Sequence, residues 1–287
     1  MSSKKQKATR RTAPKPKATK KRRNSIESGL DASFKLHQIT PLTDNQKAVM
    51  DAYYGGHQLF LYGVAGTGKS FLSLYLALQD ILAGDKGYYK LYIVRSAVPS
   101  RQIGFLPGDP DEKMDVYEKP YQEMVGRLFG RSDAYDIALN KGAIEFISTS
   151  FLRGITLDHC IVLFDEIQNA SFAELDTVIT RMGNNSRLVM CGDIEQCDLH
   201  SKHDQSGLPE FMDIIERMDL FEFIRFDVED IVRSGLVRNY IVAKHEIANE
   251  KNGSLKRMAA NYFPTSGWPT RNGSAPQIIY EAVAANA

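Results

Sequence analysis

The eight residues from Gly63 to Ser70 constrain the fold of this chain more than any other segment. They read Gly-Val-Ala-Gly-Thr-Gly-Lys-Ser, which is the pattern of a phosphate-binding loop, or P-loop. An apolar run precedes them and a denser apolar run follows, so the pattern predicts a strand over residues 57–62 and a helix over residues 71–82. A strand, a glycine-rich turn and a helix in this order form the context that the motif requires.

Each residue type in this segment meets a physical demand of nucleotide binding. The glycines let the backbone turn tightly and aim its N–H groups at phosphate oxygens, beside a helix N-terminus that favours anions. Lys69 supplies a mobile positive charge to the β- and γ-phosphates, and Ser70 offers a hydroxyl to magnesium. We expect ATP to contact the loop and the first residue of the helix, a set that comprises Gly63, Val64, Ala65, Gly66, Thr67, Gly68, Lys69, Ser70 and Phe71.

A second apolar run, residues 159–164, ends in two carboxylates, Asp165 and Glu166. A parallel sheet exposes its ligand-binding edge at the carboxyl ends of its strands, so these side chains are expected to face the phosphates. Asp165 would hold magnesium together with Ser70, and Glu166 would polarise the attacking water. The alternative is a strand whose acidic end merely caps a helix.

The next predicted strand, residues 187–191, is followed by Gly192, Asp193 and, three residues later, Gln196. Asp193 and Gln196 could sense the γ-phosphate or orient water. A simple strand-to-loop turn explains Gly192 and Asp193 about as well.

Gln46 has two interpretations. It follows Thr43 by three residues and so completes a capping box at the start of a helix, which is the interpretation that the residues alone favour. As the alternative, its amide would hydrogen-bond the edge of adenine.

Three arginines lie at or near the ends of predicted elements, where a guanidinium could reach a phosphate: Arg95, Arg153 and Arg233. Most surface arginines, however, are only solvated.

The remaining pattern predicts an α/β fold with a mostly parallel sheet covered by helices on both faces. A helix is expected to begin at Thr43 and to end at Gly55 and Gly56, and residues 99–131 are expected to form an inserted loop and helix. Further strands are predicted at residues 88–94, 143–148 and 221–226, and further helices at residues 172–182 and 231–248. The expected organisation is a disordered arm over residues 1–35, a nucleotide-binding domain over residues 36–250 and a loosely ordered tail over residues 251–287.

The charge distribution and the cysteine content indicate which partners and which compartment the chain can have. Residues 1–23 carry eleven Lys or Arg and no acid, which predicts either an electrostatic arm for nucleic acid or a solvated tail. No apolar run approaches the roughly 18 residues of a membrane-spanning helix, so no membrane partner is expected. Cys160, Cys191 and Cys197 cannot all pair, which fits a reducing cytoplasm, and a zinc site at Cys197 with His200 and His203 is disfavoured.

Six further segments follow one another in a characteristic order. They are Leu42-Thr-Asp-Asn-Gln46, Gly104-Phe-Leu-Pro-Gly108, Phe151-Leu-Arg153-Gly, Phe164-Asp165-Glu166-Ile-Gln168-Asn169, Gly192-Asp193-Ile-Glu-Gln196 and Asp230-Ile-Val-Arg233. With these segments the chain resembles the PhoH family of bacterial and phage ATPases. The resemblance implies a RecA-like P-loop core, ATP hydrolysis, an adenine contact by Gln46, and roles for Arg153 and Arg233 at the γ-phosphate or in a neighbouring subunit. Ile167 stands where bacterial members often have Ala, and no acidic cluster indicates the nuclease domain of longer relatives.

These features favour an ATPase that uses ATP and Mg²⁺ and remodels RNA or single-stranded DNA, in a bacterial cell or a phage-infected host. A nucleotide-dependent switch with slow hydrolysis and a P-loop kinase are the alternatives. Only 54 residues follow Arg233, too few for a second domain of this kind, so a motor would have to be a homo-oligomer, such as a hexameric ring. Arg233, or else Arg153, is the arginine expected to complete the ATP site of the next subunit.

Overall fold

The computed structural model describes residues 34–96, 110–193 and 207–262. Within these ranges six strands form a single sheet in the order β3-β2-β4-β5-β1-β6, and every pairing between neighbours is parallel. All six predicted strands are confirmed to within two residues at either end. Their bounds are β1 Gln58–Gly63, β2 Lys90–Arg95, β3 Ile144–Ser148, β4 Cys160–Phe164, β5 Arg187–Gly192 and β6 Phe221–Phe226.

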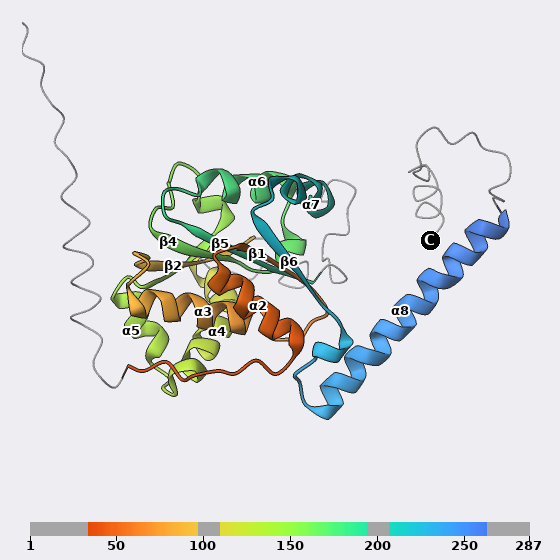
Figure 1. The fold of residues 1–287 in the computed structure, drawn as a ribbon, viewed down its shortest axis with the longest axis horizontal. Coiled ribbons are helices and arrows are strands. Elements are labelled where there is room, and N and C mark those ends of the chain that lie inside the picture. Colours follow the sequence, from red (N-terminus) through yellow and green to blue (C-terminus); the bar gives the residue numbers. More distant parts are fainter. Residues whose placement is uncertain (1–33, 97–109, 194–206, 263–287) are drawn as a thin grey trace, which may run out of the picture. The chain divides into compact units, whose positions relative to one another are not determined.

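Helices cover both faces of the sheet, as predicted (Figure 1). The helices α2 Asp44–Gly55, α3 Lys69–Ala83, α4 Pro110–Phe129 and α5 Ala134–Asn140 pack on one face. The helices α6 Phe172–Arg181 and α7 Leu208–Ile215 pack on the other. Side chains of β1 alternate between the two cores, with Leu59 and Leu61 in the first and Phe60 in the second, because successive residues of a strand point to opposite faces.

Local signals set the ends of α2 and α3. The Thr43 hydroxyl accepts a hydrogen bond from the Gln46 N–H at 3.3 Å, and Gly56, with φ of 95°, follows the last turn of α2. Gly84 ends α3 in the same left-handed conformation. The helix α2 therefore begins and ends where its capping residues predict, whereas α3 ends at the predicted glycine but begins two residues before the expected start.

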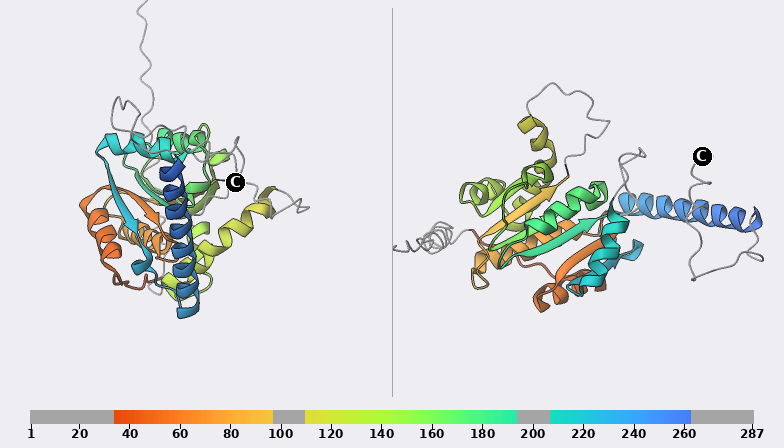
Figure 2. Two further views of the ribbon diagram at one scale, coloured as in Figure 1. Left: turned by 90° about the vertical axis from the view of Figure 1, so that its right-hand side faces the viewer. Right: turned by 90° about the horizontal axis from the view of Figure 1, so that it is seen from above.

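The segment around residues 99–131 contains the expected helix, α4, whose first turns extend past the sheet (Figure 2). The short helices α5 and α7 were not predicted. Because α5 has only seven residues and α7 eight, each offers too few turns for a helical period to stand out in the sequence.

The last helix, α8 Gly235–Tyr262, begins and ends later than the predicted span of 231–248. Residues 227–230 form a capped turn, and the Val232 N–H donates to the Gly66 carbonyl at 3.1 Å, so residues 231 and 232 are not free to become helical. The helix passes through Gly253, whose cost in a helix is only about 1 kcal/mol relative to Ala.

The chain divides into two compact units, Met1–Val232 and Arg233–Ala287. The helix α8 belongs to the second unit and continues into the segment expected to be a loosely ordered tail. Most of the basic arm and residues 263–287 lie outside the described residues, so the expected domain limits stay a prediction. Among the helices described, none is long and apolar enough to cross a membrane.

Candidate nucleotide-binding site

The predicted P-loop joins the carboxyl end of β1 to the start of α3. Its three glycines have positive φ, 115° at Gly63, 77° at Gly66 and 88° at Gly68. At Gly63 a side chain is also excluded by space, because a Cβ there would overlap the carbonyl oxygen of Phe226 on β6. The loop is therefore pressed against the neighbouring strand, and the Val64 N–H donates to the same carbonyl oxygen at 3.0 Å.

The N-terminus of α3 fits an anion. Gly68 is its N-cap, no side chain caps the first turn, and that turn contains no acidic residue. The first N–H groups of a helix have no partner inside the helix, and its dipole adds partial positive charge at this end. Phosphate oxygens would satisfy both, so the residues present fit a bound nucleotide.

Lys69 lies inside the loop rather than in solvent. Its Nζ donates to the carbonyl oxygens of Gly63 at 3.0 Å and Val64 at 2.8 Å, and the residue is 8% exposed. Burial lowers the pKa of Lys69, while the nearby Cys191 and Asp193 act in the opposite direction. The amino group of Lys69 lies at the loop as expected. It is not mobile, however, because the carbonyl oxygens of Gly63 and Val64 hold it in place.

The two predicted magnesium ligands are brought together. The Ser70 hydroxyl donates to Oδ1 of Asp165 at 2.9 Å, and Asp165 is only 5% exposed. Magnesium binds oxygen ligands and is commonly held by one or two protein groups together with substrate phosphates. A hydroxyl and a carboxylate beside the phosphate cradle fit that ion, and the described residues contain no cluster of three or more His, Cys, Asp or Glu that would hold a metal unaided.

Glu166 occupies a strained position next to Asp165. Its φ is 56°, in the left-handed region that non-glycine residues seldom adopt and that recurs at functional sites. Burial raises the pKa of Glu166, and the charge of Asp165 raises it further, against the lowering effects of Arg95, Gln168 and Lys69. A carboxylate whose pKa is moved toward neutral pH suits a general base.

Gln168 orients this carboxylate, a role that the sequence did not reveal. Its Nε2 donates to Oε2 of Glu166 at 2.6 Å, and its Oε1 accepts the Asp193 N–H at 3.0 Å. Gln168 thus connects the residues after β4 with those after β5. The Asp-Glu-x-Gln-Asn segment was the available signal, but without coordinates it gave Gln168 no partner. The expected γ-phosphate residue Gln196 lies outside the described residues.

Gln46 contacts the P-loop. Its Nε2 donates to the Thr67 carbonyl at 2.9 Å, and its Oε1 accepts the Leu42 N–H at 2.9 Å. Thr43 caps the helix as expected, but the Gln46 side chain bonds the N–H of Leu42 rather than that of Thr43. Gln46 therefore ties the segment before α2 to the loop, and its contact with adenine stays a prediction.

The three candidate arginines lie in different places. Arg95 ends β2, with its guanidinium 5.2 Å from the ring of Tyr117, and its charge acts on Glu166. Arg153 follows β3, the edge strand, which three strands separate from β1, a distance of about 19 Å at the usual strand spacing. Its two expected roles, at the γ-phosphate and in a neighbouring copy, both stay predictions. Arg233 begins the second unit, so its place relative to the P-loop is not described.

Glu174 holds the carboxyl ends of two further strands. It accepts hydrogen bonds from the hydroxyls of Ser96, after β2, and Thr149, after β3, both at 2.6 Å. The Ser171 N–H also donates to it, at 2.9 Å, which completes the cap of α6. Burial raises the pKa of Glu174, but these hydrogen bonds to the charged form outweigh it and the pKa is lowered.

The family model described as "PhoH-like protein" matches residues 38–245. The chain belongs to the PhoH-like family. It is 32% identical over 218 residues to a PhoH-like protein of Bacillus subtilis, covering 76% of this chain and 67% of that one. It is also 32% identical over 208 residues to a PhoH-like protein of Synechocystis, of which it covers 62%, and over 187 residues to the Escherichia coli protein PhoH, of which it covers 52%.

The resemblance drawn from the motifs is thereby confirmed, and the described sheet and P-loop confirm the predicted RecA-like α/β class. The chain spans about half to two thirds of the length of these relatives. Among solved structures, it is similar to the Sulfolobus solfataricus SWI2/SNF2 ATPase core in complex with dsDNA, with 15% identity, a TM-score of 0.41, and coverage of 70% of this chain and 48% of that one.

Proposed function

We propose that this PhoH-like chain is a magnesium-dependent ATPase that couples hydrolysis to the remodelling of RNA or single-stranded DNA. The observation that carries the proposal is the hydrogen bond from Ser70 to Asp165. It joins the last residue of the P-loop, at the start of α3, to the residue that follows β4, with Glu166 next to it in the chain. Two motifs 95 positions apart in the chain thereby meet at one edge of the sheet.

The arrangement assigns a task to each residue. The loop and the first N–H groups of α3 bind the phosphates, and Lys69 offsets their negative charge. Ser70 and Asp165 would hold Mg²⁺, which neutralises charge on the transferred phosphoryl group. Glu166 accepts a proton from the attacking water, and Gln168 holds the Glu166 carboxylate in place while the reaction proceeds.

The positive charge of the N-terminal arm is the reason for proposing a nucleic-acid partner. The arm over residues 1–23 has eleven positive side chains and no acid, and each contact with a phosphate adds salt-dependent affinity.

We also propose a homo-oligomer, such as a hexamer, in which Arg233 or Arg153 stabilises charge in the site of the next copy. The exposed Arg153 at the far edge of the sheet supports action between copies, and the free buried thiols of Cys160 and Cys191 support a reducing, cytoplasmic setting.

The test is steady-state ATP hydrolysis measured with RNA, with single-stranded DNA and with neither. Wild-type protein should hydrolyse ATP only with Mg²⁺ and faster with one of the nucleic acids. Lys69→Ala should lose nucleotide binding, and Glu166→Gln should bind ATP but turn it over about 100-fold more slowly, because general base catalysis contributes on the order of 10²–10⁴.

Glu222→Gln is the matched control for Glu166→Gln, because it makes the same chemical change at an exposed position on the edge strand β6. It should hydrolyse ATP as wild type does. If Glu166→Gln turned over ATP at the wild-type rate, Glu166 would not be the general base. Slow hydrolysis that neither nucleic acid alters would instead favour the nucleotide-dependent switch.

A further inference from the structure

Asp165 accepts a hydrogen bond from a residue that no motif singles out. The hydroxyl of Tyr121 donates to Oδ2 of Asp165 at 2.8 Å. Tyr121 lies on α4 and is 1% exposed. A buried phenol seldom leaves its hydroxyl without a partner, and here the partner is the carboxylate expected to hold magnesium.

Among the described residues, the contact adds a donor to the second oxygen of this carboxylate. Its Oδ1 accepts the Ser70 hydroxyl at 2.9 Å and the Glu166 N–H at 3.1 Å, while Tyr121 occupies the other oxygen. The three donors come from α3, from the end of β4 and from α4. The terminal torsion of an aspartate is broad, so donors on both oxygens are needed to fix the plane of its carboxylate.

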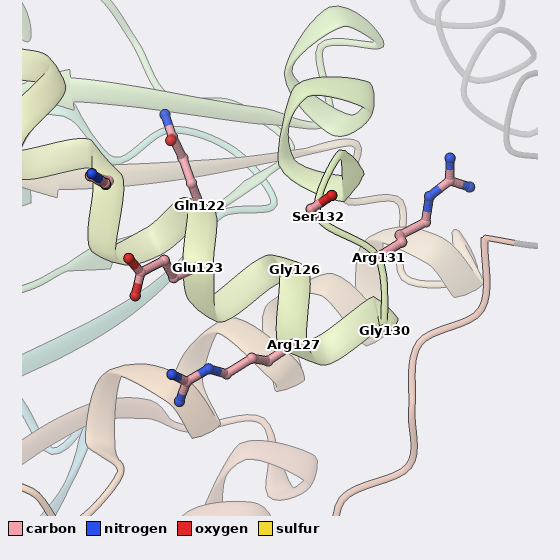
Figure 3. A pocket seen from close by; sticks show the side chains of 8 residues that line it. Gln122, Glu123, Gly126, Arg127, Gly130, Arg131 and Ser132 are labelled. Atoms are coloured by element: carbon pink, nitrogen blue, oxygen red, sulfur yellow. The ribbon is translucent and has the colours of Figure 1, made fainter.

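The ring of Tyr121 is itself held in place. It packs against the ring of Phe146 on β3, with centroids 5.6 Å apart, and Val125 one turn later is fully buried on the same side of α4. The opposite side of α4 faces solvent, where Gln122, Glu123 and Arg127 line an open pocket of about 540 Å³ (Figure 3). Tyr121 therefore faces the sheet, and its hydroxyl has little freedom to leave Asp165.

We infer that Tyr121 is a positioning residue for magnesium: its hydroxyl fixes the Asp165 carboxylate in the orientation in which that carboxylate and Ser70 together receive the ion. The inference rests on the proposed Mg²⁺-dependent nucleotide site. A partner that orients a metal ligand contributes on the order of 10–100-fold to metal affinity, and Tyr121 takes this part for Asp165.

Tyr121→Phe tests the inference, because it removes the hydroxyl and keeps the buried ring. The matched control is Tyr135→Phe. Tyr135 is also 1% exposed and donates to a carboxylate, Oε1 of Glu118 on α4, at 2.6 Å, but it does not contact Asp165. Both changes leave a phenylalanine in the same core, and both remove a hydrogen bond to a carboxylate.

The measurement is the binding of a fluorescent ADP analogue to the full chain over a series of Mg²⁺ concentrations, together with ATP hydrolysis over the same series. Tyr121→Phe should need about tenfold more Mg²⁺ for half-maximal signal, whereas its binding of the analogue without Mg²⁺ should equal that of wild type. Tyr135→Phe should follow the wild-type curve. The half-maximal concentration does not depend on the fraction of active protein, so partial unfolding cannot imitate the shift.

A wild-type Mg²⁺ dependence in Tyr121→Phe overturns the inference while leaving the proposed function standing. Equal shifts in the two tyrosine variants overturn it as well, since they would trace the effect to the packing of α4. If wild-type protein binds the analogue with no dependence on Mg²⁺ and hydrolyses no ATP, the proposed function fails and the inference fails with it.

Discussion

Replacing Gly63 by alanine should damage both the fold and the nucleotide site. The residue has a φ of 115°, and an added Cβ would lie 2.9 Å from the backbone nitrogen of Phe226 and closer still to its carbonyl oxygen. Real Cβ atoms essentially never approach within 3.0 Å of such a neighbour. Because the obstacle is backbone, it cannot be relieved by the rotation of a side chain.

The expected loss is worked out from two contributions. The positive φ alone costs a residue with a Cβ about 1–2 kcal/mol. Moving β1 away from β6 adds the loss of the Val64 to Phe226 hydrogen bond, about 1 kcal/mol, and an overpacking cost of about 1–3 kcal/mol. The sum, about 3–6 kcal/mol, is a large part of the 5–15 kcal/mol that typically stabilises a protein.

Gly154→Ala separates the two contributions. Gly154 has a φ of 86°, but a Cβ there would meet no atom within 4 Å. Urea unfolding should show a loss of about 1–2 kcal/mol for Gly154→Ala and at least twice that for Gly63→Ala, which should also bind nucleotide more weakly. Equal losses in the two variants would refute the argument that the P-loop is fixed by its contact with β6.

Two further predictions concern Glu174 and the neighbouring subunit. Because the folded-state pKa of Glu174 is lowered, its stabilisation is present above the unfolded-state value of about 4.3 and is lost as the pH falls through the folded-state value. Glu174→Gln should therefore have a free energy of unfolding at pH 7 that is about 1–2 kcal/mol lower than that of wild type. This difference should shrink as the pH falls, and a difference that does not depend on pH would contradict the prediction. Mixing inactive Glu166→Gln with inactive Arg233→Ala should restore ATP hydrolysis if Arg233 acts between copies, and no recovery at any ratio, or a fully active monomer, would contradict it.

Much of the fold was predictable because its signals are local. The six strands are apolar runs of strand length, and the caps of α2 and α3 are single residues at fixed offsets. The P-loop is contiguous in sequence, so its glycines, Lys69 and Ser70 could be assigned together. Asp165 and Glu166 followed from one rule, that the carboxyl ends of parallel strands share a sheet edge.

The rest of the site depends on contacts between distant residues. Tyr121 bonds Asp165 across 44 positions, from a segment whose periodicity is unclear, and nothing near Tyr121 in sequence marks it. Gln168 is in a recognised motif, but its role rests on Asp193, 25 positions later. A sequence pattern can indicate which residues are important, but it does not show which of them contact each other. In this site the roles of Tyr121 and Gln168 follow from those contacts.

The strand order explains how the two motifs meet although their strands are not neighbours. The strand β5 lies between β1 and β4, so the motif strands are about 10 Å apart. Residues after β4 must therefore cross the end of β5, where Gly192 has no side chain. A Cβ at Gly192 would lie 2.6 Å from Cγ1 of Ile167 and 2.9 Å from Oε1 of Gln168. Gly192, which the sequence presented as an ordinary turn residue, thus makes room for Gln168 and with it for the orientation of Glu166.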